Sequence, residues 1–500
     1  MCLSALAAAT SFTSCSDDDE TFFPNAPTVE KPDLVFYGLT TSNGLVKYNA
    51  NNSGTPISNM SVTGLQGGET LLAIDFRPGT GQLYGLGSTS RLYIIDQNSG
   101  AATALGAGPF APALSGSLTG FDFNPTVDRI RLVTSSGQNL RLHPETGGVA
   151  ATDGNLNPGT PNIGSAAYTN NTSGATATDL FVIDFASGTL NKQSPPNDGT
   201  LVAVGSLQLA ATPTVDGGFD IAPNSGIALA NFGSAATSNL YQIDLTSGKA
   251  TDLGALSTPI IGLAIPTSPV AYAVDSSNNL HTFNFMSPGT PVSKAITNLQ
   301  GAETILGIDM RPATGQLFAL GSSGRLYILN TATGAAAAVG VGPVLGLNGT
   351  NFGFDFNPLV DRIRIVSDTG QNLRANPNDG LLVLADGALN PGAPNVTGAA
   401  YTNSFPGTTA TVLFDIDSTT DMLYKQDPPN NGTLTSIGAL GVDVSASNGF
   451  DIGGTSNIGY AILTVGGTNA IYSINTTSGA ATQIAAFPIA VKGFAVGLGF

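Results

Sequence analysis

The fold is decided by QGGETLLAIDFRPGTGQLYGLGSTSRLYIIDQNSGAATALG at residues 66–106, which returns as QGAETILGIDMRPATGQLFALGSSGRLYILNTATGAAAAVG at residues 300–340 with 25 of 41 positions identical. Within each half, a shorter unit recurs five times with an apolar opening segment. The openers are LLAIDF (71–76), TGFDF (119–123), GSAAYT (164–169), GGFDIA (217–222) and IGLAIP (261–266), then LGIDM (306–310), FGFDF (352–356), TGAAYT (397–402), NGFDI (448–452) and KGFAV (492–496). They lie 44 to 53 residues apart, which is the length of one four-stranded propeller blade or one solenoid repeat.

Residues 70–108 show how one unit is built. Four short segments rich in Leu, Ile, Tyr and Ala are separated by glycine-bearing turns such as Asn98-Ser99-Gly100, where glycine supplies the positive φ that hairpins need. No segment shows a sustained 3.6-residue period, so we expect almost no helix. The sequence therefore predicts an all-β β-propeller of ten four-stranded blades. A β-helix fits less well because its coils are shorter and more uniform.

The number of rings follows from the usual size of propellers. Rings of four to eight blades are typical, so we expect two five-bladed rings, with one ten-bladed ring as the alternative. Residues 34–60 match the second to fourth strands of a blade, and 493–499 match its missing first strand. Because an open sheet edge invites aggregation, we expect the C-terminus to complete that blade. This assigns 34–256, closed by 491–500, to the first propeller and 257–490 to the second, with 261–274 as one hairpin.

Composition and the N-terminus indicate where the protein works. The net charge of −17 makes a nucleic acid a poor partner. Both cysteines lie in the first 15 residues, so the folded body has no disulfide. Residues 1–15 read as a signal segment whose Phe12-Thr13-Ser14-Cys15 resembles a bacterial lipobox, and an acidic run follows at 16–20, as in surface lipoproteins of the Bacteroidetes. We expect acylation at Cys15, an acidic, Pro-bearing tether over 16–33, and export as a monomeric outer-membrane or cell-surface lipoprotein that meets the membrane only through this anchor. The alternative is a chance cysteine in a disordered tail.

Three phrases and their copies carry a family resemblance. They are GFDFNPTVDRIR (120–131), GQNLR (137–141) and PPNDGTL (195–201), repeated at 353–364, 370–374 and 428–434. Together they resemble domain-of-unknown-function family 4394, in two tandem copies over nearly all of 34–500. The resemblance implies a propeller-like fold and an exported protein, and it implies no activity, ligand or catalytic residue.

The ten arginines form the sharpest pattern of charged residues. Each arginine of the first half has a counterpart in the second, and none lies outside these pairs. The candidate site residues are Asp122, Arg129, Arg131 and Arg141, with their copies Asp355, Arg362, Arg364 and Arg374. One interpretation is a guanidinium cluster near the ring axis that holds a carboxylate, a phosphate or a sulfated glycan. The other, which we favour, is ion pairing between packed blades, with Asp122 or Asp128 within reach of the arginines.

Metal and catalytic signals are weak. Aspartates in six opening strands (Asp75, Asp122, Asp220, Asp309, Asp355 and Asp451) could ring an axial channel and bind Ca²⁺, although such residues more often bond backbone amides. We therefore predict no metal site and no cofactor, with Ca²⁺ as the open alternative. The only histidines, His143 and His281, align with Asn376 and Val46 and are not part of the repeated framework. No nucleophile elbow or P-loop occurs.

These observations favour a surface-tethered, non-enzymatic binding or scaffold propeller. Its partner would be a small anionic or glycan ligand, or a protein. The alternative is an extracellular hydrolase or lyase that acts on a glycan or lactone with acidic residues at the axis.

Overall fold

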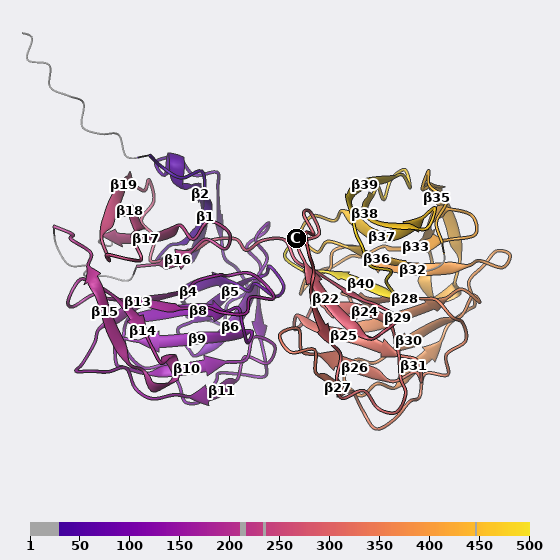
Figure 1. The fold of residues 1–500 in the computed structure, drawn as a ribbon, viewed down its shortest axis with the longest axis horizontal. Helices are drawn as coiled ribbons and strands as arrows, with labels where there is room; N and C mark the ends of the chain where they lie inside the picture. The colour runs from indigo at the N-terminus through magenta and orange to yellow at the C-terminus, as the bar shows by residue number, and fades with distance from the viewer. Residues whose placement is uncertain (1–29, 211–216, 234–236, 446–447) are drawn as a thin grey trace, which may run out of the picture.

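The computed structural model describes residues 30–210, 217–233, 237–445 and 448–500. Over these residues, forty strands form ten antiparallel four-stranded sheets, so the predicted all-β fold of ten blades is confirmed. Figure 1 shows the blades in two lobes, the first indigo to magenta and the second salmon to yellow. The helical segments in this part of the chain are short 3-10 turns, η1 (Ala50–Asn52), η2 (Pro196–Asp198) and η3 (Pro429–Asn431). Within the described residues, no helix has the length and apolar character to cross a membrane.

The first lobe contains twenty strands. They are β1 (Val35–Leu39), β2 (Gly44–Asn49), β3 (Ser58–Ser61), β4 (Leu71–Phe76), β5 (Leu83–Gly87), β6 (Arg91–Ile95), β7 (Ala102–Leu105), β8 (Thr119–Asn124), β9 (Arg129–Thr134), β10 (Asn139–Leu142), β11 (Val149–Thr152), β12 (Ile163–Tyr168), β13 (Leu180–Asp184), β14 (Thr189–Gln193), β15 (Leu201–Ser206), β16 (Phe219–Ile221), β17 (Ala228–Gly233), β18 (Ser238–Ile243), β19 (Ala250–Ala255) and β20 (Gly262–Ala264).

The second lobe repeats this series. Its strands are β21 (Ala271–Val274), β22 (Asn279–Phe283), β23 (Val292–Ala295), β24 (Ile305–Arg311), β25 (Gln316–Gly321), β26 (Leu326–Leu329), β27 (Ala336–Ala338), β28 (Phe352–Asn357), β29 (Arg362–Ser367), β30 (Asn372–Ala375), β31 (Leu382–Ala385), β32 (Val396–Tyr401), β33 (Leu413–Asp417), β34 (Met422–Gln426), β35 (Leu434–Ala439), β36 (Gly449–Ile452), β37 (Gly459–Val465), β38 (Thr468–Ile474), β39 (Ala481–Ala486) and β40 (Gly493–Val496).

The innermost strands of the blades group into two circuits. In the first lobe β4, β8, β12, β16 and β20 contact one another in a closed series, and in the second lobe β24, β28, β32, β36 and β40 do the same. Each lobe is therefore a ring of five blades, and the alternative of one ten-bladed ring is wrong.

The predicted closure is also wrong, because each ring closes on its own last strand. β1 pairs with β20 (Tyr37↔Ala264), and β21 pairs with β40 (Ala271↔Val496). The first ring thus spans 35–264 and the second 271–496, and residues 491–500 belong to the second. The expected hairpin over 261–274 does not form, since β20 and β21 lie in different sheets. Seven extended residue steps from 264 to 271 can span about 23–25 Å, so even this short link can carry the chain from one ring to the next.

The core lies between neighbouring blades rather than in one central mass. Inner and middle strands such as β5 are buried along their whole length, whereas the outermost strand β31 is exposed along its whole length. Aromatic rings join adjacent blades: Tyr84 meets Phe123 edge-on with ring centroids 5.1 Å apart. Both faces of a blade are therefore packed, which explains why its middle strands read as continuous apolar runs.

The two rings are joined through the C-terminal residues, which lie between the lobes (Figure 1). The Gly499 amide donates to the Thr80 carbonyl (2.8 Å), and the Gln97 side-chain amide donates to the Gly499 carbonyl (2.8 Å). The Tyr272 hydroxyl donates to the Gly79 carbonyl (3.0 Å). The last strand of the chain therefore leads directly into the contact between the rings.

Candidate functional site

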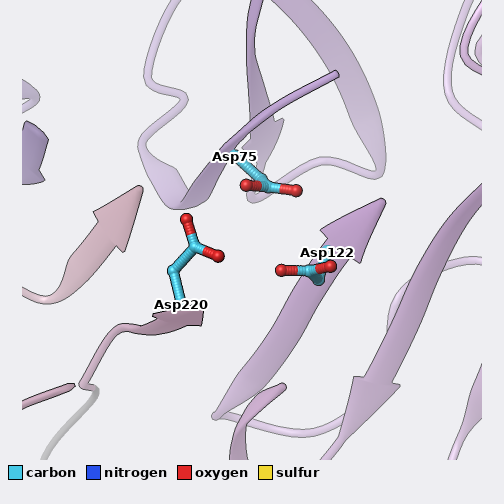
Figure 2. Close-up of side chains that lie close together, drawn as sticks. All are labelled: Asp75, Asp122 and Asp220. Atoms are coloured by element: carbon cyan, nitrogen blue, oxygen red, sulfur yellow. The ribbon is translucent and has the colours of Figure 1, made fainter. Parts of the chain in front are cut away.

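Three aspartates from three blades meet at the axis of the first ring. Figure 2 shows Asp75 of β4, Asp122 of β8 and Asp220 of β16 turned toward one another. Carboxylate oxygens of the three lie within 4.8 Å of one another, and the side chains are buried. The second ring holds the same arrangement with Asp309, Asp355 and Asp451. We call these two groups the axial triads.

Each axial carboxylate bonds to the backbone of the next blade. These bonds are Phe123 N–H to Asp75 (2.8 Å), Tyr168 N–H to Asp122 (3.1 Å), Ile265 N–H to Asp220 (2.6 Å), Phe356 N–H to Asp309 (2.7 Å), Tyr401 N–H to Asp355 (3.0 Å) and Val496 N–H to Asp451 (2.6 Å). All except Asp122 and Asp355 also accept a bond from the amide of the following residue. The triads therefore tie the inner strands of adjacent blades together.

Burial and mutual repulsion raise the pKa values of the axial carboxyls. Burial raises the pKa of Asp220 and of Asp451 to about 7. Burial and the neighbouring Asp220 raise the pKa of Asp75 well above its ordinary range. Near neutral pH each triad must therefore share protons or hold a cation. Ca²⁺ takes six to eight oxygen ligands, and most oxygens here already accept amide bonds, so the geometry fits blade-to-blade bonding better than a calcium site.

The Arg131 side chain is buried between two blades. Its guanidinium donates to Asp153 (2.6 Å) and Asn139 (2.7 Å) in its own blade and to Asn197 (2.8 Å) in the next blade, where its Nε also reaches the Tyr168 hydroxyl (3.3 Å). The copy Arg364 makes the same bonds to Asp386, Asn372, Asn430 and Tyr401. These two arginines lie between blades and away from the ring axis where the functional interpretation placed them.

The acidic partners differ from those expected. Asp122 stands opposite Arg131 in the strand register but takes part in the axial triad, and Asp128 binds Arg77 through both oxygens, at 2.9 and 2.5 Å. The partner of Arg131 is Asp153, after the outermost strand. Its copy Asp386 is followed by glycine, as Asp153 is, so the repeated Asp-Gly pair was a sequence signal that could have identified both residues.

One carboxylate serves two guanidinium groups in each ring. Arg141 grips Asp153 with Nε and Nη2 (2.8 Å each), and Arg374 grips Asp386 in the same way (2.7 and 2.9 Å). Burial raises the pKa of Asp153, but bonds from Arg141 and Arg131 outweigh it and leave this pKa below its ordinary value. The group therefore carries one positive charge in excess.

Arg129 and Arg362 add a second positive charge. Arg129 donates to the carbonyl of Asp128 (2.7 Å) and Arg362 to that of Asp361 (2.8 Å). Among the described residues neither has a carboxylate partner.

A cavity of about 290 Å³ opens beside these arginines in the second ring. Its lining residues are Asn357, Leu359, Val360, Arg362, Ile363, Arg364, Arg374, Tyr401, Thr411, Pro429 and Asn430. We call it the arginine cavity. The lining combines three arginines with the apolar side chains of Leu359 and Val360, which are about half exposed.

Comparison with known proteins identifies the family of this chain. The family model described as "Domain of unknown function (DUF4394)" matches residues 44–264 and 279–495. The chain belongs to the DUF4394 family. The two DUF4394 matches start at β2 and β22 and end in β20 and β40, so each copy corresponds to one ring.

No curated protein matches this DUF4394 chain. Among solved structures, it is similar to the extracellular domain of BT4673 from B. thetaiotaomicron, described as a hybrid two-component system, at 11% identity and a TM-score of 0.27. That similarity covers 90% of this chain and 64% of that one.

Cys15 lies outside the described residues. Asp415 in β33 was not singled out from the sequence: it is fully buried, and neither carboxylate oxygen has a hydrogen-bond partner. The same position of the first ring is Val182.

Proposed function

We propose that this protein is an exported, surface-tethered binding propeller that holds a small anionic ligand, such as the acidic group of a glycan, in the arginine cavity. The observation that carries the proposal is Arg362, which lines the cavity and whose guanidinium has no carboxylate partner among the described residues. A guanidinium with free N–H groups binds carboxylate, phosphate or sulfate through paired hydrogen bonds.

The surroundings of Arg362 suit such a ligand. Arg374 adds a partly exposed guanidinium (24% exposed) whose partner Asp386 is shared with Arg364. The apolar wall of Leu359 and Val360 can cover the non-polar face of a sugar ring or an aliphatic chain. Binding sites commonly combine apolar walls with a few fixed polar groups in this way.

The first ring has the same residue types at most of these positions. Arg129, Arg131, Arg141, Tyr168 and Asn197 correspond to Arg362, Arg364, Arg374, Tyr401 and Asn430. The proposal therefore extends to a counterpart beside Arg129, where Thr126 stands in place of the apolar Leu359.

The alternative of a hydrolase with axial acids has less support. Glycosidases keep their two carboxyl groups about 5–5.5 Å or 6.5–9.5 Å apart across an open site. The axial carboxylates are at most 5% exposed and already bonded to backbone amides, so a substrate could not reach them without opening the ring.

The surface location rests on the sequence of residues 3–20. The apolar segment, Cys15 and the acidic run occur in the order that an exported lipoprotein requires.

Calorimetric titration with a panel of uronic acids, sulfated oligosaccharides and inorganic phosphate tests the binding proposal. Arg362→Met should weaken binding of the best ligand by at least tenfold, because a hydrogen bond to a charged group contributes about 1.5–3 kcal/mol. Arg325→Met, which removes the same charge outside the cavity lining, should leave affinity unchanged. Failure of every anion to bind, or equal loss in both variants, would overturn the proposal.

A further inference from the structure

A Ser–His–Asp hydrogen-bond chain lies in the first blade of the second ring, away from the arginine cavity. The Ser293 hydroxyl of β23 is 2.7 Å from Nδ1 of His281 in β22. Nε2 of His281 is 3.2 Å from Oδ2 of Asp275, which follows β21. A hydroxyl beside a base that a third group orients is the signature of an activated nucleophile.

We propose that Ser293 is a nucleophile for ester hydrolysis, with His281 as its general base and Asp275 as the residue that orients His281. This activity goes beyond the binding function proposed above.

The acid end of the chain is held in place. Asp275 accepts bonds from the amides of Ser277 (2.9 Å) and Asn279 (2.8 Å) and from the Asn279 side chain (2.9 Å). A carboxylate fixed in this way favours the tautomer with its proton on Nε2 of His281. Nδ1 then carries the lone pair that faces the Ser293 hydroxyl.

The side chains of His281 and Ser293 differ in exposure, as a nucleophilic site requires. His281 is buried, with 4% of its surface exposed, whereas Ser293 is exposed on the outermost strand of its blade. The base is therefore shielded while the hydroxyl can reach an ester carried by a large extracellular molecule. Gly174 of the first ring lies against Val292, so the serine stands beside the junction of the two rings.

The register of β23 supplies a donor for the oxyanion. His281 pairs with Ser293, and the amide of Ile296 bonds to the carbonyl of Asn278 (2.8 Å). Even-numbered residues of β23 therefore direct their amides toward β22, and the Ser293 amide points to the open edge of the sheet. His281 and Ser293 thus form the closer, non-hydrogen-bonded kind of pair, which brings their side chains together.

The first ring builds the same blade without this chain. Thr40, Val46 and Asn59 occupy the positions of Asp275, His281 and Ser293. The Thr40 hydroxyl even accepts the Gly44 amide (2.8 Å), as Asp275 accepts that of Asn279. The blade therefore folds without a histidine, and the departure from the repeat marks the site.

The chemistry is ordinary acyl transfer. The Ser293 oxygen attacks the ester carbon while His281 takes the hydroxyl proton, and the Ser293 amide donates to the oxyanion. The bond to the leaving alcohol then breaks, and His281 returns the proton to that alcohol. Water attacks the acyl-serine with His281 again as base, which releases the carboxylic acid and restores Ser293.

A fluorophosphonate probe followed by peptide mass spectrometry tests the assignment on the full chain, with p-nitrophenyl acetate hydrolysis as the second readout. We expect labelling at Ser293 in the folded wild-type protein. Ser293→Ala and His281→Val, the latter carrying the residue of the first ring, should reduce hydrolysis about 100-fold or more. Ser287→Ala, which changes another exposed serine of the same blade, should leave both readouts unchanged.

Two outcomes would overturn the proposal. One is a folded wild-type protein that carries no probe at Ser293, a result that needs no variant to fold. The other is hydrolysis that persists in Ser293→Ala with an unchanged melting curve.

Discussion

Replacing Asp415 with valine should stabilise the second ring, and by more at neutral pH than in acid. Asp415 lies in a cluster position between two blades, where the first ring packs Val182 against Val133 and Ala166. Its carboxyl is fully buried and neither oxygen is bonded. The substitution restores the residue that the same fold already uses in its other copy.

The magnitude has two parts. A buried polar group without a partner costs about 1–3 kcal/mol even when neutral. Burial, opposed only by the nearby Arg364, raises the pKa of Asp415 from an ordinary 3.8 to about 8. The folded state therefore keeps a proton that the unfolded state loses above pH 4, so stability falls by about 1.4 kcal/mol per pH unit until pH 8 and then levels off.

Thermal unfolding followed by circular dichroism between pH 4 and pH 9 measures this effect. At pH 4 Asp415→Val should raise the melting temperature of the second ring by roughly 2–12 °C, given about 2–4 °C per kcal/mol for a domain of this size. The gain should grow up to pH 8.

The reciprocal change Val182→Asp is the matched control and should destabilise the first ring with the opposite pH trend. A gain for Asp415→Val that is equal at all pH values, or a loss of stability, would refute the reasoning.

Four further predictions follow from the rings and their ends. Arg131→Met should destabilise the first ring by about 3–5 kcal/mol by chemical denaturation, because it leaves buried acceptors unpaired, whereas Arg129→Met should cost little; equal effects would contradict the burial argument. The first ring should lose thermal stability as pH rises from about 4 to 7, because burial raises the pKa of Asp220 to about 7 and the folded state alone retains the proton; if EDTA lowers the melting temperature at pH 8, the triads hold a cation instead. Deleting residues 491–500 should expose the second ring to limited proteolysis before the first, since β40 completes only that ring, and earlier cleavage of the first ring would argue against this closure. Cys15→Ala should abolish labelling by a fatty-acid analogue in a bacterial host, and labelling that persists would remove the anchor from Cys15.

The sequence was sufficient for the blades but not for their closure. The apolar openers recur with the period of one blade or one solenoid repeat, and the four strand-like segments between glycine turns within each unit favour the blade. The two closing segments, IGLAI at 261–265 and KGFAV at 492–496, have the same pattern, so either could complete the blade that begins at Val35. Which of the two segments closes this blade depends on how far residues 265–270 reach in space, and the spacing of the repeats carries no information about that distance.

The candidate site residues were likewise only partly predictable from the sequence. Arg131 and Arg364 could be selected because they are paired charges in a chain with few charges. Asp153, however, lies 22 residues further along the chain, beyond two turns and the two strands β10 and β11. The axial triads join residues up to 145 positions apart, Asp75 to Asp220. Asp415 was not singled out at all because it breaks the repeat, and His281, although visible as a departure from the repeat, gave no sign in the sequence of its contacts with Asp275 and Ser293.

The way each ring closes has an evolutionary consequence. Because β1 and β20 stand at the two ends of one copy, a duplicated gene segment encodes a second ring that can shut without borrowing a strand from its parent. Such a duplicate folds from its first appearance, and while one ring keeps the original role the other is free to change. The two rings show such divergence at single positions. Val182 of the first ring corresponds to Asp415 of the second, and Val46 corresponds to His281.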